Sequence, residues 1–333
     1  MTPASTSLLR PLRLGLTAAC LALLAACGGS GGTDTVDPPV EPPAADQLRT
    51  AQRIAGYPHD IDLYIPAGAT RAIVFLHGGT GRNFSIAYQL GINTNGTAAS
   101  QLAPTASTVD WAWLRANKVI AVFPQGQVAP RTADATTWSN WAMNSGQDDV
   151  AFLRALASYL RSSFAITKLG LSCHSMGGTM TNRMWCESPT TFDAYVAIAG
   201  PASAHFLDAA TPCRPTTVQP YMSIIGSDDN VMRDQDWTAQ RWTILPLLSE
   251  SPGFINPDVW GEWDHLAERV QQRCGGAAPA LDAKTTTDST EIWSACSGSI
   301  VQWRILGADH GINGMESIRK KRMVDAVASF VGF

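Results

Sequence analysis

Charged residues are scarce in this 333-residue chain: they make up 16% of it, against about a quarter in a typical globular protein. Basic residues are not in excess either, because the formal net charge is −4. Nucleic-acid backbones are bound by clustered Lys and Arg, so the composition argues against a nucleic-acid partner. The hydrophobic content of 45% is that of an ordinary globular chain, long enough for one large domain or two small ones.

Spacings typical of metal ligands are also absent. The six histidines are scattered, and the seven cysteines form neither CxxC nor CxxH patterns. Zinc sites are usually built from such clusters. We therefore expect neither a bound metal nor another cofactor.

The N-terminal segment 1–26 has the composition of an export signal. Two arginines precede an apolar run from Leu14 to Ala26, which is shorter than the roughly 20 residues of a membrane-spanning helix. The sequence Leu24-Ala25-Ala26-Cys27 resembles a bacterial lipobox, in which the cysteine receives lipid. We expect a lipoprotein anchored through Cys27 at the outer membrane, in the periplasm or at the cell surface. A plain secretory signal cleaved near Ala26 is the alternative.

The remaining chain divides into a tether and one folded domain. Residues 27–45 are rich in Gly, Ser, Thr and Pro, which predicts a disordered tether. Residues 46–333 are expected to form the domain. Within it, 236–273 interrupts the pattern and is expected to be an insertion that covers the site. Its tryptophans Trp237, Trp242 and Trp260, together with Trp141, are candidates for substrate binding or for core packing.

Apolar runs alternate with segments of helical pattern in this domain. The runs expected to be strands are 61–65, 72–76, 119–123, 166–171, 195–199, 221–225 and 301–306. The segments expected to be helices are 109–117, 150–162, 179–185 and 315–331. This alternation predicts an α/β fold, with a mostly parallel sheet and helices on both faces.

One link between a strand and a helix carries a serine among small residues. It reads Ser172-Cys173-His174-Ser175-Met176-Gly177-Gly178. A serine on a strained turn between strand and helix is the nucleophile elbow of α/β-hydrolases, usually G-x-S-x-G. Cys173 replaces the first glycine and is small enough to fit. We predict the α/β-hydrolase fold with Ser175 as nucleophile; an ordinary Ser/Gly-rich turn is the alternative.

A serine nucleophile needs a base and an acid that orients the base, and in this fold they follow in the order Ser, Asp or Glu, His. Two aspartates, Asp228 and Asp229, follow the strand 221–225, and both remain candidates for the acid. His310 follows the strand 301–306 and is the candidate base, whereas His265 lies in a segment of helical pattern.

The oxyanion of the reaction needs backbone N–H donors. Met176 directly follows the nucleophile and supplies the first. The loop His77-Gly78-Gly79-Thr80 follows an earlier strand, and Gly79 is expected to supply the second, with Thr80 as the alternative. We expect His77 to brace this loop and His174 to pack beside the elbow.

Several stretches resemble the polyhydroxybutyrate depolymerase-like esterases, whose relatives include feruloyl and acetylxylan esterases. The resemblance covers the chain from about Ile61 to its end and rests on FLHGG (75–79), WSNW (138–141), DDVAFL (148–153), the elbow and RMWCE (183–187). In that family the acid lies three residues past the loop glycine, which implies Asp229. The family pattern also implies disulfides Cys186–Cys213 and Cys274–Cys296, with Cys173 left as a buried thiol. The loop after His310 lacks the family's usual tryptophan and proline.

The expected function is therefore ester hydrolysis through a Ser–His–Asp triad. Hydroxyalkanoate oligomers, polyesters and aromatic esters such as feruloyl conjugates are the candidate substrates. An amidase or peptidase using the same triad is one alternative. A non-catalytic surface lipoprotein that serves as a binding module is the other.

Overall fold

The computed structural model describes residues 40–130, 132–207, 210–229, 231, 241–243, 258–260 and 262–332. All of them belong to the unit Pro39–Phe333. The export signal, Cys27 and Trp237 lie outside the described residues. Residues 40–45 were expected to belong to the tether, and in the structure the carbonyl of Pro43 accepts a hydrogen bond from the Gly68 N–H at 2.8 Å.

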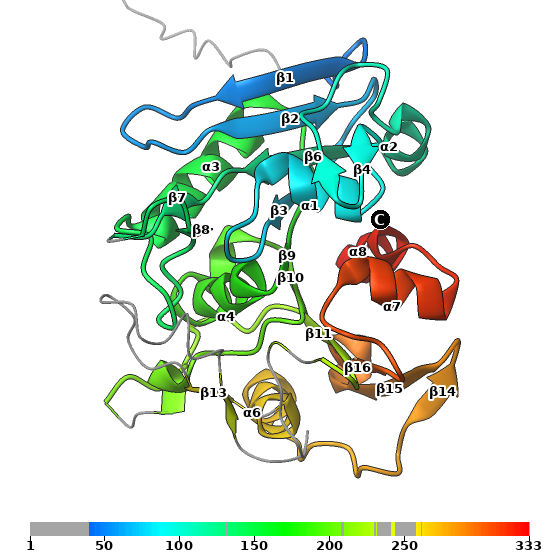
Figure 1. Ribbon diagram of the computed structural model, residues 1–333. Coiled ribbons are helices and arrows are strands. Elements are labelled where there is room, and N and C mark those ends of the chain that lie inside the picture. The colour runs from blue at the N-terminus through cyan, green and yellow to red at the C-terminus, as the bar shows by residue number, and fades with distance from the viewer. Residues whose placement is uncertain are drawn as a thin grey trace, which may run out of the picture. The chain divides into compact units, whose positions relative to one another are not determined.

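A ten-stranded sheet runs through this unit in the order β1-β2-β6-β3-β9-β10-β11-β16-β15-β14 (Figure 1). Its strands are β1 (Gln47–Gln52), β2 (Ile61–Ile65), β3 (Arg71–Leu76), β6 (Val119–Pro124), β9 (Lys168–His174), β10 (Ala194–Ile198), β11 (Tyr221–Gly226), β14 (Thr285–Thr287), β15 (Thr290–Ala295) and β16 (Ile300–Ile305). The six strands from β6 to β16 in this order run parallel to one another. The outer strands on either side pair antiparallel. The expected mostly parallel sheet is confirmed.

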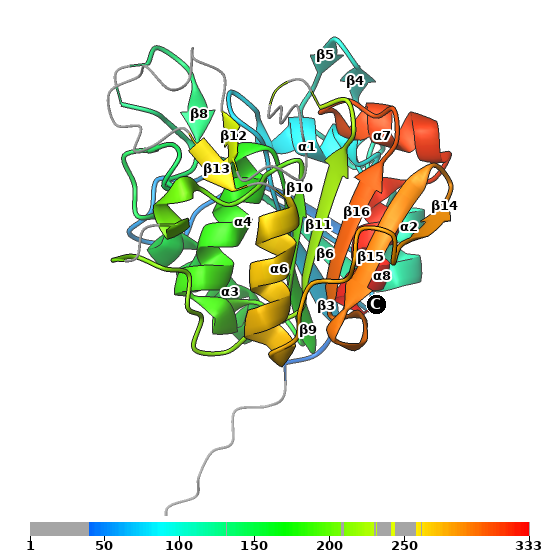
Figure 2. The ribbon, with the colours of Figure 1, turned by 90° about the horizontal axis from the view of Figure 1, so that it is seen from below.

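Helices cover both faces of the sheet (Figure 2). They are α1 (Asn83–Gln89), α2 (Trp111–Asn117), α3 (Asp149–Ser163), α4 (Met176–Glu187), α6 (Glu262–Cys274), α7 (Ile312–Arg319) and α8 (Met323–Val331). Short 3-10 turns lie at η1 (Pro189–Thr191), η2 (Ala204–Leu207) and η3 (Cys296–Gly298). Two-stranded pairs form between β4 (Gly96–Thr97) and β5 (Ser100–Gln101), β7 (Gln127–Val128) and β8 (Thr136–Thr137), and β12 (Arg241–Thr243) and β13 (Asp258–Trp260).

Each face of the sheet has its own hydrophobic core. The side chains of α3, α4 and α6 pack into one core, and those of α1, α2, α7 and α8 pack into the other. Because the central strands are buried on both faces, they are continuous apolar runs rather than alternating ones. The continuous apolar runs allowed the central strands to be predicted from the sequence.

Part of the expected insertion 236–273 is a core helix. Leu266 and Val270 of α6 pack in the core shared with α3 and α4. His265 lies in this helix, as expected, and is buried. The rest of the segment is described only at β12 and β13, so its expected role as a cover over the site lies outside the described residues.

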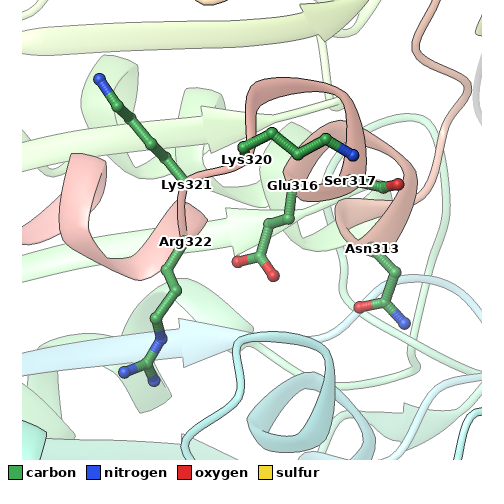
Figure 3. Close-up of a pocket in the computed structure, with 6 residues that line it drawn as sticks. All are labelled: Asn313, Glu316, Ser317, Lys320, Lys321 and Arg322. Carbon is green, nitrogen blue, oxygen red and sulfur yellow. The ribbon is translucent and has the colours of Figure 1, made fainter.

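The last helix was expected to run unbroken over 315–331, and this was wrong. Lys320 adopts a left-handed conformation (φ 56°) and ends α7, and α8 begins at Met323. A cavity of about 360 Å³ lies at this junction (Figure 3). Two of the cations that line it are paired, Arg322 with Asp110 at 2.9 Å and Lys321 with Asp288 at 2.5 Å. These ion pairs hold the segment between α7 and α8 against Asp110 and Asp288.

The parallel strands bring four loops to one edge of the sheet. The loops after β3, β9, β11 and β16 all leave from carboxyl ends of neighbouring or next-neighbouring strands. Ligand sites of open α/β sheets form at this edge. The candidate residues of the sequence lie in these loops.

Candidate active site

Ser175 lies on a strained turn between β9 and α4. Its φ of 55° and ψ of −122° fall in a region that non-glycine residues rarely adopt. The backbone segments around Ser175 lie close together, since a Cβ added to Gly178 would lie 2.8 Å from the Cα of Gly200. Small residues are therefore required here, which is the physical basis of the expected elbow. Ser175 is 8% exposed.

His310 and Asp229 meet although 81 residues separate them. The Nδ1 of His310 lies 2.8 Å from Oδ2 of Asp229, and the two side chains are 15% and 2% exposed. A carboxylate can only accept, so Nδ1 carries the proton and Nε2 is left as a proton acceptor. The Oδ1 of Asp229 accepts a hydrogen bond from the N–H of Val231. Asp228 is exposed and accepts a hydrogen bond from the Ser227 hydroxyl instead.

His174 links the elbow to the loop of His310. Its ring lies 4.9 Å from that of His310, and its Nε2 donates to the His310 carbonyl at 2.9 Å. Burial lowers the pKa of His174 to about 3. The neutral ring therefore holds the histidine loop against the elbow, in agreement with the expectation that His174 packs there.

The loop after β3 lies against the nucleophile. A Cβ on Gly78 would lie 2.9 Å from the Cβ of Ser175, and one on Gly79 would lie 3.3 Å from Cγ of Met176. The N–H of Thr80 is already donated to the Thr136 carbonyl at 2.7 Å. Met176 is the first residue of α4, where backbone N–H groups have no partner within the helix. Met176 and Gly79 remain the better pair of donors.

His77 braces this loop, as expected. Its Nε2 accepts a hydrogen bond from the Gly126 N–H at 2.9 Å, so its Nδ1 donates to the Gly78 carbonyl at 2.7 Å. Burial lowers the pKa of His77 to about 4, so the ring is neutral near pH 7. The indole of Trp138 donates to the His77 carbonyl at 3.0 Å.

Asn140 is a site residue to which the sequence analysis assigned no role. Its amide Nδ2 donates to the Met176 carbonyl at 2.8 Å, and its Oδ1 accepts from the backbone N–H groups of Ala142 and Met143. The side chain is fully buried. Asn140 therefore ties the loop between β8 and α3 to the first residue after the nucleophile. Its place in the WSNW stretch was the only signal.

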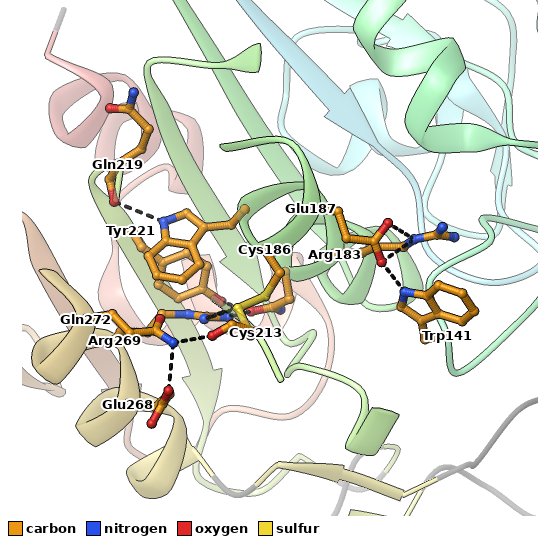
Figure 4. The surroundings of a disulfide bond; sticks show 12 residues. Trp141, Arg183, Cys186, Glu187, Cys213, Gln219, Tyr221, Glu268, Arg269 and Gln272 are labelled. Atoms are coloured by element: carbon orange, nitrogen blue, oxygen red, sulfur yellow. Dashed lines mark hydrogen bonds and ion pairs between the residues drawn. A yellow bond between two sulfur atoms is a disulfide. The ribbon is translucent and has the colours of Figure 1, made fainter. Parts of the chain in front are cut away.

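Both expected disulfides are present. Cys186 is bonded to Cys213, and Cys274 is bonded to Cys296. The guanidinium of the buried Arg269 lies 3.1 Å from the sulfur of Cys213 (Figure 4). It also lies over the ring of Trp185. Cys173 is a free buried thiol, as expected, and burial raises its pKa to about 12. It is therefore uncharged near neutral pH and a weak nucleophile.

Of the tryptophans expected to bind substrate, only Trp141 has a side chain among the described residues, so their expected role stays a prediction. Trp141 is partly buried, and its indole N–H donates to the carboxylate of Glu187 (Figure 4). Trp242 and Trp260 lie on the paired strands β12 and β13, where only the backbone is described.

No protein-family model matches this chain, and no curated protein matches its sequence. Solved structures do match. An acetyl xylan esterase from Aspergillus awamori aligns over 86% of this chain and 99% of its own, with a TM-score of 0.52 and 13% identity. A feruloyl esterase module from Clostridium thermocellum covers 89% of this chain and 92% of its own (TM-score 0.47, 13% identity). An S-formylglutathione hydrolase from Agrobacterium tumefaciens covers 86% and 95% (TM-score 0.47, 11% identity). The strained turn at Ser175, the strand order of the sheet and the match to the acetyl xylan esterase structure together show that the chain has the α/β-hydrolase fold.

Proposed function

We propose that this chain is a serine esterase in which Ser175 is the nucleophile, His310 the base and Asp229 the acid that orients it. The hydrogen bond between His310 Nδ1 and Asp229 Oδ2, at the same edge of the sheet as a serine held at φ 55°, carries this proposal. It leaves His310 Nε2 free to take a proton at the edge where the elbow exposes its serine.

The reaction proceeds through an acyl-enzyme. Ser175 Oγ attacks the ester carbonyl carbon as His310 Nε2 takes its proton, and the N–H groups of Met176 and Gly79 bind the oxyanion. The C–O bond to the alcohol then breaks, and the alcohol leaves with the proton from His310. Water attacks the acyl group, gives a proton to His310 and releases the acid, after which Ser175 recovers its proton. Each oxyanion donor contributes about 3 kcal/mol of barrier lowering.

The substrates we propose are hydroxyalkanoate oligomers, polyesters or aromatic esters such as feruloyl conjugates. This choice rests on the sequence resemblance to polyhydroxybutyrate depolymerase-like and feruloyl esterases. A panel of paired ester and amide substrates tests it. Turnover of the amides alone would replace the proposal with an amidase.

An active-site-directed phosphonate tests the nucleophile itself. We expect it to label the peptide that contains Ser175 in the wild-type protein and to label nothing in Ser175→Ala. A folded wild-type protein without label, and without turnover of any ester, would refute the proposal in favour of a non-catalytic binding module.

We also propose that the protein is exported and anchored to a membrane through lipid on Cys27. The two disulfides support an oxidising compartment. Within the described part of the chain, none of the helices is both long and apolar enough to cross a membrane. Labelled palmitate should be incorporated into the wild-type protein in its bacterial host and not into Cys27→Ser. Equal labelling of the two would contradict the anchor.

A further inference from the structure

A cavity of about 410 Å³ lies between the loop that precedes α3 and the side of α4. Trp141, Met143, Asn144, Gln147 and Arg183 are among the residues that line it. It contains none of the triad residues. Its contacts nevertheless connect it to the elbow, because the side chain of Asn140, in the same loop, is hydrogen-bonded to the Met176 carbonyl.

The helix α4 connects the elbow to the wall of the cavity. Arg183 lies seven residues after Met176 on α4, which is about 10 Å along the helix axis. Its guanidinium donates to the Ser139 carbonyl at 2.5 Å. Only a substrate that extends well beyond the cleaved ester would therefore reach both Ser175 and Arg183.

Trp141 is held in place at a cost to the backbone. Its φ is 69°, and a bulky residue in this region costs about 1–3 kcal/mol. The indole ring packs 4.1 Å from the ring of His205 and 4.3 Å from the guanidinium of Arg183. The indole N–H is bonded to Glu187 (Figure 4). These contacts hold the indole in one orientation beside the cavity.

The charges around the cavity are already compensated. Arg183 pairs with Glu187 at 3.1 Å, and Asp148 caps α3 by accepting from the Ala151 N–H at 3.0 Å. An anion would find no cation without a partner among these residues. The remaining lining offers the amide of Gln147 and the NH2 group of Asn144, whose Oδ1 already accepts from Ser139 and Gly146. These amides lie beside Trp141 and the largely buried Met143. This combination suits an uncharged unit with an apolar face and hydrogen-bonding oxygens.

We propose that this cavity is a subsite for a distal, uncharged and oxygen-rich unit of an extended ester, with Trp141 as its aromatic wall. The proposal rests on the proposed esterase function of Ser175. It assigns the chain a preference for extended esters over short ones.

The test compares one short and two extended substrates. We would measure kcat/KM for p-nitrophenyl acetate, for a 3-hydroxybutyrate tetramer and for an acetylated xylotetraose; the two extended probes distinguish an ester unit from a sugar unit. Trp141→Ala should lower the ratio of extended to short kcat/KM about tenfold, the effect of losing about 1.4 kcal/mol of binding. Gln147→Trp, at an exposed position, should lower the ratio by filling the cavity.

Trp113→Ala is the matched control. The indole of Trp113 also donates to a carboxylate, that of Asp325, and an arginine, Arg322, also lies over its ring, but on α2 on the opposite face of the sheet. The ratio of extended to short kcat/KM in Trp113→Ala should equal that of the wild type. Equal losses on short and extended substrates in Trp141→Ala and Gln147→Trp, or an unchanged ratio in both, would overturn the subsite.

A binding measurement tests the subsite independently of the proposed catalytic activity. Calorimetry of the two extended probes with Ser175→Ala should detect binding that is lost in Ser175→Ala/Trp141→Ala. Such binding, combined with a wild-type protein that hydrolyses no ester, would refute the proposed function and retain the subsite. Hydrolysis of short esters without binding of either extended probe would refute the subsite and retain the function.

Discussion

Two adjacent aspartates follow β11, and their environments differ. Asp229 is buried and faces His310, whereas Asp228 is exposed and hydrogen-bonded to a neighbouring serine. Spacing within the loop could not separate them, because both lie within reach of the same edge of the sheet. The family pattern favoured Asp229, and the hydrogen bond to His310 supports that choice.

This contrast predicts the effect of two matched substitutions. Asp229→Asn should lower kcat for ester hydrolysis by about 10³- to 10⁴-fold, because the amide no longer fixes the His310 tautomer that accepts the serine proton. Asp228→Asn should leave kcat within about twofold of the wild type. Steady-state kinetics on p-nitrophenyl acetate measure both. A larger loss in Asp228→Asn than in Asp229→Asn would reverse the assignment.

At the scale of elements, the loop after β3 is positioned by close contact with the elbow. A Cβ on Gly78 would lie 2.9 Å from that of Ser175, too close without a shift of one of the two. We expect Gly78→Ala to lower kcat about 100-fold, the effect of misplacing an oxyanion donor. Gly276→Ala, whose added Cβ would have no neighbour closer than 3.7 Å, is the control and should retain activity. Similar rates for all three proteins would show that the loop does not position the reaction.

The two disulfides close loops of similar length, with sequence separations of 27 and 22. Loop entropy therefore predicts nearly equal stabilisation, about 3.5 kcal/mol each. Arg269 distinguishes them, because its buried guanidinium contacts the sulfurs of Cys186 and Cys213. Replacing this pair with alanines should lower the free energy of unfolding more than replacing Cys274 and Cys296. Urea unfolding of both double variants tests this, and equal losses would show that the Arg269 contact contributes nothing.

Sequence patterns identified the elements buried on both faces and missed those at the edges. The central strands are apolar runs, and the expected ranges overlap the observed ones, although the strand expected over 166–171 lies at Lys168–His174. The edge strand β1 (Gln47–Gln52) is polar and half of it is exposed, so it gave no apolar signal. The left-handed turn at Lys320, which separates α7 from α8, leaves no glycine or proline in the sequence to mark it. The contacts of Asn140 join distant segments, which local patterns do not encode.

At the scale of the whole molecule, three buried histidines make stability depend on pH. Burial lowers the pKa of His77 to about 4, that of His174 to about 3, and that of His265 well below its usual value. The unfolded chain binds protons at these residues near pH 6.5, whereas the folded protein does not. The free energy of unfolding therefore falls as the pH falls below about 6.5. Each histidine contributes up to about 1.4 kcal/mol per pH unit.

Urea unfolding at pH 7.5, 6.5 and 5.5 measures this slope. His265→Phe should reduce the slope by about a third, since one of the three groups no longer titrates. The phenyl ring retains the edge-to-face geometry that His265 makes with Tyr221. Constant stability of the wild-type protein over this pH range would mean that these histidines bind protons as readily in the folded protein as in the unfolded chain.

The central claim is that Ser175 is a nucleophile activated by His310 and Asp229. Phosphonate labelling with peptide mass mapping, on the wild-type protein, Ser175→Ala and Asp229→Asn, tests it most directly. The account predicts a label on the Ser175 peptide of the wild type, much slower labelling in Asp229→Asn, and none in Ser175→Ala. Label on another serine, or equal rates in the wild type and Asp229→Asn, would contradict it.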